Sequence, residues 1–368
     1  MQKPYKNIIP VAFIGIIWLV LAVFCWIKPS DEISKSERRK LEQLPKLTSD
    51  TLLSGEFMKD FDHYTQDQFP RRTVFRKLKA YTRFYLFAQK DNNDIYLENG
   101  YAAKLEYPLN ESSILSAADK FRYLYEKYMK EQNLKVYLSV IPDKGYYLAA
   151  PNGYPSMDYE KLFKIMKEHT KFAEYIDISD VLRLEDYYNT DIHWRQEKLL
   201  PVVEKLGAAM HSLKELSLRY DVIEAENPFY GVYYGQSALP LEPEKLYYLT
   251  NDTIRDCTVD NVETKQMTPV YDMEKMNGRD PYEGYLSGAA PLLFIDNPHA
   301  ANKKELIVFR DSFGSSLIPL LLEGYSKVTL VDIRYIASDY LENFITFDNQ
   351  EVLFLYSTPV LNSSMVLK

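Results

Sequence analysis

The sequence is poor in the residues that build disulfide frameworks and metal centres. Among its 368 residues there are two cysteines and five histidines. Cys25 lies in a long apolar segment and Cys257 in a distant polar one, so we expect no disulfide between them, and a cysteine-rich metal site is excluded. None of the histidines belongs to a metal-binding pattern such as HExxH. We therefore expect a protein without a metal or cofactor.

Positive charge is also scarce. The chain has 44 lysines and arginines against 52 aspartates and glutamates, a net charge of −8. Nucleic acid is therefore excluded as a partner, because a phosphate backbone requires a basic surface. Apolar residues make up 46% of the chain, enough for one large α/β domain, alone or with a smaller insertion. The 31 tyrosines suit either sugar binding or half-buried strand positions.

Charge is missing altogether from Ile8 to Ile27. Twenty residues of helix span the roughly 30 Å hydrocarbon core of a bilayer. Lys3 and Lys6 precede the segment, which favours a cytoplasmic N-terminus and an extracytoplasmic main domain. We interpret residues 1–28 as an uncleaved signal anchor in the cell membrane. A cleaved signal peptide is the alternative, although no convincing cleavage site follows the apolar run.

Residues 29–50 are predicted to be a polar linker, and residues 51–368 the main domain. Phe57, Phe61 and Tyr64 lie on one face of a predicted helix, and Thr73 to Phe87 form a second amphipathic helix. We expect the aromatic residues of both helices to pack in a core. Further helices are predicted over 113–132, 159–171 and 195–213 and from 315, with strands over 135–141, 175–178, 305–309, 328–331 and 352–356.

Short apolar strands that alternate with helices indicate an α/β fold, with a mainly parallel sheet covered on both faces. Residues 219–290 interrupt this rhythm with a composition rich in Tyr, Asp, Asn and Pro. We expect them to form an irregular or β-rich insertion near the functional site.

The motif Arg310-Asp311-Ser312-Phe313-Gly314 follows a buried-type strand and precedes a helix. Ligands of an open parallel sheet bind beyond the carboxyl ends of its strands. A serine there is held rigidly beside a helix N-terminus, whose N–H groups can stabilise an oxyanion. Taken alone, Ser312 is better explained as a simple helix cap.

The segment Thr190-Asp191-Ile192-His193-Trp194 supplies what a serine nucleophile requires. Serine needs a neutral imidazole as base, and the imidazole needs a carboxylate to orient it. Asp191 and His193 are two residues apart, so on an extended segment both side chains point to the same side. The alternative is a surface aspartate beside a half-buried histidine. Trp194 would wall the pocket or stack on a sugar.

Further polar groups are expected at the same sheet edge. Lys144 follows the 135–141 strand and Arg334 follows the 328–331 strand, so either cation would bind an anionic sugar or polarise an acyl carbonyl. Each is also compatible with surface charge that has no role. Gly288 is a candidate oxyanion N–H donor, and Asp311 is counted with these accessory residues.

The combination of Asp-x-His-Trp with a later Arg-Asp-Ser-Phe resembles the bacterial DHHW family, which is SGNH-hydrolase-like and related to the alginate O-acetyltransferases. Five further segments carry the resemblance: 37–39 with Leu41 and Pro45, 67–71, 141–144, 187–191 and 353–357. Two positions depart from the pattern. Ile192 stands where a second histidine is expected, and Ala289 stands where an amide residue is expected after Gly288.

The resemblance implies a flavodoxin-like α/β/α sandwich with a permuted SGNH site. Ser312 would be the nucleophile, His193 the base and Asp191 the orienting acid. The implied function is O-acyl transfer, with acetyl the expected group, to an extracellular polysaccharide, with a membrane acyltransferase partner as donor. A carbohydrate acetyl esterase, a catalytically silent polysaccharide-binding or assembly protein, and a structural envelope protein are the alternatives.

Overall fold

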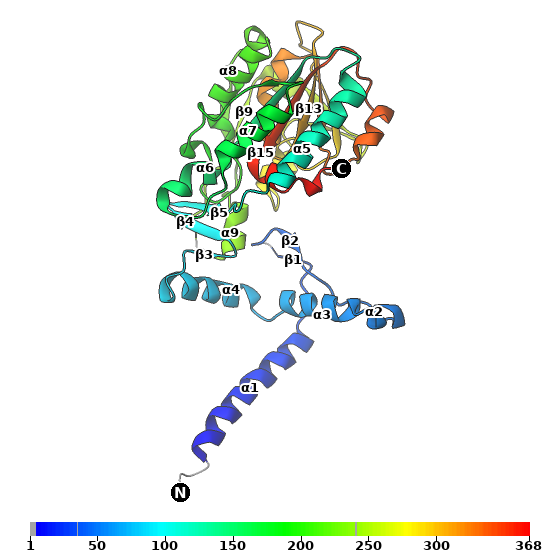
Figure 1. The fold of residues 1–368 in the computed structure, drawn as a ribbon. Helices are drawn as coiled ribbons and strands as arrows, with labels where there is room; N and C mark the ends of the chain where they lie inside the picture. Colours follow the sequence, from blue (N-terminus) through cyan, green and yellow to red (C-terminus); the bar gives the residue numbers. More distant parts are fainter. Residues whose placement is uncertain (1–4, 35, 240) are drawn as a thin grey trace. The chain divides into compact units, whose positions relative to one another are not determined.

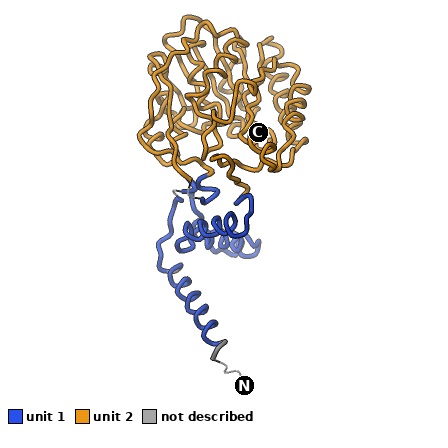
Figure 2. The backbone as a smooth tube through the Cα atoms, turned by 90° about the vertical axis from the view of Figure 1, so that its left-hand side faces the viewer, with its two compact units in different colours: residues 1–93, 234–240 blue, residues 94–233, 241–368 orange. Residues whose placement is uncertain are grey.

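The structure is a computed structural model that describes residues 5–34, 36–239 and 241–368. It divides into two compact units (Figure 2). Unit 1 comprises Met1–Asn93 with Tyr234–Pro240, and unit 2 comprises Asp94–Tyr233 with Leu241–Lys368. The domain boundary predicted between residues 50 and 51 lies inside unit 1. The 219–290 segment contributes residues to both units.

Unit 1 begins with a long apolar helix, α1 (Tyr5–Ile27). Its segment Ile8–Cys25 has a mean hydropathy of 2.9, and it is the one helix of the described residues that is long and apolar enough to cross a membrane. The elements that follow are β1 (Ile33–Ser34), β2 (Arg39–Lys40), α2 (Ser49–Leu53), α3 (Glu56–Asp67), α4 (Arg72–Tyr81), the π-helical turn η1 (Thr82–Leu86) and β3 (Asp91–Asn92).

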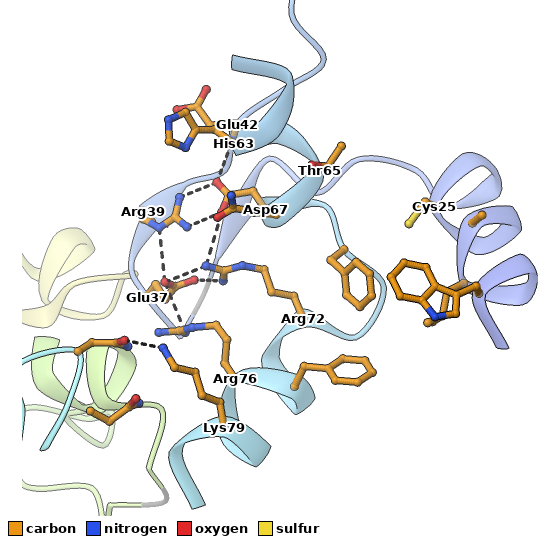
Figure 3. Close-up of a pocket in the computed structure, with 18 residues that line it drawn as sticks. Cys25, Glu37, Arg39, Glu42, His63, Thr65, Asp67, Arg72, Arg76 and Lys79 are labelled. Atoms are coloured by element: carbon orange, nitrogen blue, oxygen red, sulfur yellow. Dashed lines mark hydrogen bonds and ion pairs between the residues drawn. The ribbon is translucent and has the colours of Figure 1, made fainter. Parts of the chain in front are cut away.

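The segment predicted to be a linker is folded, because ion pairs join it to α3 and α4 (Figure 3). Arg39 donates to both carboxylate oxygens of Asp67, at 2.5 and 2.7 Å. Glu37 accepts from Arg72 and lies 3.4 Å from Arg76. The hydrogen bond from Arg39 lowers the pKa of the Asp67 carboxyl, so this pair stays ionised. Residues 33–34 and 36–40 are thus part of the folded unit 1.

The expected core packing of the aromatic residues on α3 and α4 is wrong for most of them. Phe61, Phe75, Tyr81 and Tyr85 are all exposed. Periodicity gave the helices and their apolar faces correctly, but the described residues do not cover these faces.

Unit 2 is built on an eight-stranded sheet of order β11-β10-β12-β14-β13-β15-β6-β7. The strands β14, β13, β15, β6 and β7 pair in parallel, and β12, β10 and β11 add an antiparallel side. Their bounds are β6 (Val136–Ile141), β7 (Glu174–Tyr175), β10 (Thr258–Asn261), β11 (Gln266–Pro269), β12 (Leu292–Asp296), β13 (Glu305–Arg310), β14 (Lys327–Val331) and β15 (Glu351–Ser357).

Both faces of the sheet are buried, because successive side chains of a strand point to opposite faces. Leu306 and Val308 of β13 pack in one core with residues of α8 (Leu200–Ala209) and the 3₁₀ segment η8 (Ile318–Gly324). Ile307 and Phe309 pack in the other core with residues of α5 (Glu111–Leu124) and α7 (Tyr159–His169). Figure 1 shows α5 and α7 in front of β13 and β15. The α/β/α class predicted from the alternating elements is confirmed.

The helices of unit 2 are α5 (Glu111–Leu124), α6 (Lys144–Leu148), α7 (Tyr159–His169), α8 (Leu200–Ala209), α10 (Asp252–Asp256), α11 (Met273–Met276), α12 (Gly314–Leu317) and α13 (Thr358–Asn362); α9 (Val232–Ser237) runs across the chain boundary of the two units. Four of these helices, namely α5, α7, α8 and α12, were expected from the pattern, whereas the short helices α6, α10, α11 and α13 were not. The helix predicted from Arg195 begins at Leu200 instead. Pro201 lacks an N–H and is tolerated only in a first helical turn, so it sets this start.

The segment predicted as an insertion is only partly separate from the sheet. β8 (Asp221–Glu224) and β9 (Tyr247–Thr250) form a hairpin of their own. β10 and β11, in contrast, extend the main sheet through β12. A second small hairpin, β4 (Ile95–Glu98) and β5 (Tyr101–Lys104), lies earlier in unit 2.

Candidate active site

Ser312 lies just beyond the carboxyl end of β13, a strand that has parallel neighbours on both sides. The turn that carries it is fixed by Asp311, which is fully buried. Asp311 accepts the N–H of Phe313 at 3.0 Å and, from the next strand, the N–H of Ser357 at 2.7 Å. Both oxygens of Asp311 are therefore engaged in holding the turn. The sequence placed Asp311 among the groups that contact the substrate, but in the structure its carboxylate holds the turn instead.

Ser312, His193 and Asp191 form one continuous hydrogen-bonded chain. His193 Nε2 lies 2.8 Å from Ser312 Oγ, and His193 Nδ1 lies 2.6 Å from Asp191 Oδ1. Asp191 is almost fully buried, whereas the imidazole keeps 13% of its surface exposed. With Nδ1–H donating to the carboxylate, Nε2 is free to accept the serine proton. This is the arrangement of a nucleophile, a base and an orienting acid.

A closed loop presents the aspartate and the histidine. Tyr187 and Trp194 form an antiparallel bridge, and the Tyr188 N–H donates to the His193 carbonyl at 3.1 Å. Within the loop the His193 N–H donates to Asp191 Oδ1 at 3.1 Å. Residues 188–193 are thus constrained at both ends, and the two side chains meet on one side.

A second segment braces this loop from outside. The Val232 N–H donates to Asp191 Oδ2 at 2.8 Å, and the Gly231 N–H donates to Thr190 Oγ1 at 2.9 Å. Glu244 accepts the N–H groups of Asn189 and Thr190, both at 2.7 Å. These three bracing residues come from the segment predicted to be irregular, and no motif marks them.

Lys144 lies beneath the same loop instead of facing a substrate. Its ammonium is buried and donates to the carbonyls of Ala102, Tyr188 and Asn189. Burial lowers the pKa of Lys144 to about 7, although the neighbouring carboxylates of Asp191 and Glu244 oppose the shift. The structure gives this lysine a supporting position, different from the one expected from the sequence.

Aromatic side chains fix the plane of the imidazole. Tyr282, in the 3₁₀ turn η7 (Pro281–Gly284), stacks on His193 with ring centroids 3.8 Å apart and an interplanar angle of 9°. Its hydroxyl lies 2.9 Å from Ser316 Oγ. Trp194 is fully buried, and its indole N–H donates to Ser316 Oγ at 2.9 Å and to the Phe313 carbonyl at 3.1 Å. Trp194 therefore joins the histidine loop to the serine turn and presents no face to a sugar.

The two arginines near the serine are already engaged by the protein. Arg334 pairs with Asp332 through Nε at 2.8 Å and Nη2 at 2.6 Å. Arg310 is fully buried, and burial lowers its pKa, an effect that Asp332 opposes. A Cβ on Gly314 would lie 2.9 Å from the Arg310 Cβ. The absence of a side chain at Gly314 therefore leaves room for the Arg310 side chain.

The backbone N–H groups of Gly288 and Ser312 are the two candidate oxyanion donors at the site. The Gly288 N–H donates to the Tyr285 carbonyl at 3.1 Å, so the expected donor is occupied in a turn. The Ser312 N–H donates to no acceptor among the described residues, which leaves it available for an incoming oxygen. In the same described part of the chain, no group of three or more His, Cys, Asp or Glu side chains is arranged to hold a metal ion.

Neither a family model nor a curated protein matches the chain, but solved structures do. A DHHW family protein from Eubacterium siraeum matches with 19% identity and a TM-score of 0.60, over 76% of this chain and 97% of its own. Bacillus cereus PatB1, solved with a sulfonyl adduct, matches with 18% identity and a TM-score of 0.58, over 73% and 95% of the two chains. The O-acetyltransferase domain of Pseudomonas putida AlgJ matches with 12% identity and a TM-score of 0.45, over 73% and 92%. The likeness to the first two structures confirms the expected fold.

Proposed function

We propose that the protein is a serine O-acyltransferase that moves an acetyl group to a hydroxyl of a cell-surface or secreted polysaccharide. One observation carries the proposal: the unbroken hydrogen-bonded chain from Asp191 through His193 to Ser312, at the edge of the sheet where α/β folds bind ligands. The similarity of this fold to a DHHW protein and to PatB1 supports it.

In the first half-reaction, Ser312 Oγ attacks the carbonyl carbon of the acyl donor while its proton passes to His193 Nε2. The carbonyl oxygen becomes an oxyanion, which the Ser312 N–H would stabilise. Collapse of this intermediate breaks the bond to the leaving group, which takes the proton from His193. The acetyl group is then an ester of Ser312, and Asp191 has kept the imidazole in one tautomer throughout.

The second half-reaction runs the same steps in reverse with a new partner. His193 removes the proton of a sugar hydroxyl as its oxygen attacks the acetyl-serine ester. Ser312 leaves with the proton from His193, and the acetylated sugar departs. Water in place of the sugar would give hydrolysis, so the acceptor decides between a transferase and an esterase.

The place of the reaction follows from α1 if that helix stays in the membrane. We propose that α1 is an uncleaved anchor, with the N-terminus in the cytoplasm and the main domain outside. Acetyl-coenzyme A is absent there, so the donor would come from a membrane acyltransferase partner. Protease accessibility of the main domain on intact cells tests this orientation, and protection of the domain would contradict it.

The chemistry is tested with the full chain in detergent, 4-nitrophenyl acetate as donor and an oligosaccharide as acceptor. We expect acetyl transfer to the sugar, and the trapped intermediate should show a mass increase of about 42 Da on Ser312, because one acetyl group replaces one hydrogen. Ser312→Ala and His193→Ala should each lower kcat/KM by about 10³-fold or more. Equal rates for wild type and Ser312→Ala would favour a catalytically silent binding protein. Acetate release without sugar acetylation would favour an esterase.

A further inference from the structure

An exposed apolar stripe runs along α4 and η1. Val74, Leu78, Tyr81 and Tyr85 recur at helical spacing, and their exposed fractions are 58%, 57%, 44% and 73%. Ala80, on the other side of α4, is fully buried. The helix is therefore packed against the protein on one side and presents large apolar side chains on the other. Single exposed apolar residues need no explanation, but an aligned set marks an interaction surface.

The charge around this stripe is of one sign. From Gln68 to Lys90 the chain has seven lysines and arginines and no aspartate or glutamate, although the whole protein carries −8. Arg71 and Lys77 border the stripe, three residues from Val74 on either side. Neither forms an ion pair with another described residue. Basic side chains beside an apolar helix face are typical of helices that lie in a membrane surface, where they reach anionic headgroups.

The chain holds this surface close to the end of the apolar helix α1. Asp31 follows the last residue of α1 by four positions, a reach of at most about 14 Å. Its backbone N–H donates to Gln68 Oε1, and its carbonyl accepts from Gln68 Nε2, both at 2.9 Å. Gln68 is buried and caps the C-terminus of α3, and α4 begins four residues later. If α1 spans a membrane, the start of α4 is therefore held near its surface.

We propose that the stripe of α4 and η1 lies in the surface of the bilayer that α1 crosses, with its apolar side chains below the headgroups and Arg71 and Lys77 among anionic lipids. This inference rests on the proposed anchoring by α1. It gives unit 1 a second attachment, which limits how far the segment after the anchor can move away from the membrane. The occupant is lipid, and a protein partner on the same stripe is the competing outcome of the test.

The test is a depth measurement on the full chain in nanodiscs that contain phosphatidylglycerol. Single cysteines replace Leu78 or Tyr85 after both native cysteines have been changed to alanine, and each carries a nitroxide spin label. Power saturation compares label contact with oxygen, which enters lipid, and with a water-soluble nickel chelate. A matched label at Val222, exposed on β8, reports the aqueous reference. A label at Ile16 reports on α1.

We expect the Leu78 and Tyr85 labels to lie about 5–10 Å below the headgroup level and the Val222 label to remain in water. In nanodiscs of neutral lipid alone, Leu78 and Tyr85 should become more accessible to the nickel chelate. The Ile16 label could lie in the bilayer centre while the Leu78 and Tyr85 labels are exposed to water. This result would overturn the surface proposal but not the anchor, and it would favour a protein partner for the stripe. An Ile16 label outside the bilayer would overturn the anchor itself.

Discussion

A Cβ atom on Gly231 would lie 2.1 Å from the carbonyl carbon of Thr190. Only a bare Cα permits the two backbones to come this close. Their approach is what brings the Val232 N–H to Asp191 Oδ2, at 2.8 Å. The orienting acid of the candidate triad thus depends on a glycine that lies 40 positions further along the chain.

Replacing Gly231 by alanine should therefore impair catalysis by displacing the aspartate loop. Misplacement of a reacting group by about 1 Å costs on the order of 10²-fold in rate, and we expect a fall in kcat of that size. The measurement is kcat with an activated acetyl ester, alongside circular dichroism to establish that the fold is retained. A folded Gly231→Ala enzyme of wild-type rate would show that the loop does not need this contact.

The hydrogen bond from Val232 can be removed separately from the contact at Gly231. Val232 is the first residue of α9, where proline fits the helix backbone, and Val232→Pro deletes the N–H that Asp191 accepts. The proline ring also pushes against the carboxylate, so the loss expected for the hydrogen bond alone is a lower limit. A hydrogen bond to a charged group is worth about 1.5–3 kcal/mol, which predicts a fall in kcat of roughly 10- to 100-fold. Val232→Ala keeps the N–H and is the matched control. Equal losses in the two variants would assign the effect to the side chain instead.

Tyr282 offers a separate test of how the imidazole is held. Tyr282→Phe keeps the ring that stacks on His193 but loses the hydroxyl near Ser316. A neutral hydrogen bond contributes about 1 kcal/mol, so kcat/KM should fall only about fivefold. Tyr282→Leu removes the stacking on His193 as well, so kcat/KM should be lower still in that variant. If the phenylalanine variant is the more damaged of the two, the hydroxyl rather than the stacking positions the base.

The sequence predicted the elements whose signal is local. The apolar runs at 136–141, 305–310 and 351–357 are buried strands, because continuous Val, Ile, Leu and Phe have no polar face to expose. The Asp-x-His pair and the serine motif also carry their chemistry in a few adjacent residues. The structure brings those two motifs together although 119 positions separate His193 from Ser312.

The residues that brace the site could not be found in the same way. Gly231, Glu244 and Tyr282 lie in the 219–290 segment, where neither helical nor strand periodicity marks a side chain as buried. Their roles come from long-range contacts to the loop that carries His193. The core packing predicted for the aromatic faces of α3 and α4 was wrong for a related reason. Periodicity shows which face of a helix is apolar but not what covers that face. Lys144 was placed at the correct sheet edge, but its burial under the loop depends on the β4–β5 hairpin, which no motif indicated.

The buried lysine makes the stability of unit 2 depend on pH. The pKa of Lys144 is lowered by burial to about 7, against 10.5 for an ordinary lysine. Between these values the unfolded chain binds the proton and the folded chain does not, so stability rises with pH through this window, by up to about 1.4 kcal/mol per pH unit. Below about pH 7 both states are protonated, and the dependence disappears.

Lys144→Met keeps most of the side-chain volume but cannot titrate, so it isolates this effect. The free energy of unfolding of the wild type minus that of the variant should increase by roughly 2–3 kcal/mol from pH 7 to pH 9 and stay constant below pH 6. The measurement is urea unfolding in detergent, followed by the fluorescence of buried Trp194 with Trp18 and Trp26 changed to phenylalanine. A difference that does not change with pH would mean that Lys144 keeps its proton in the folded state. The three carbonyls that accept from it would then hold the charged form against burial.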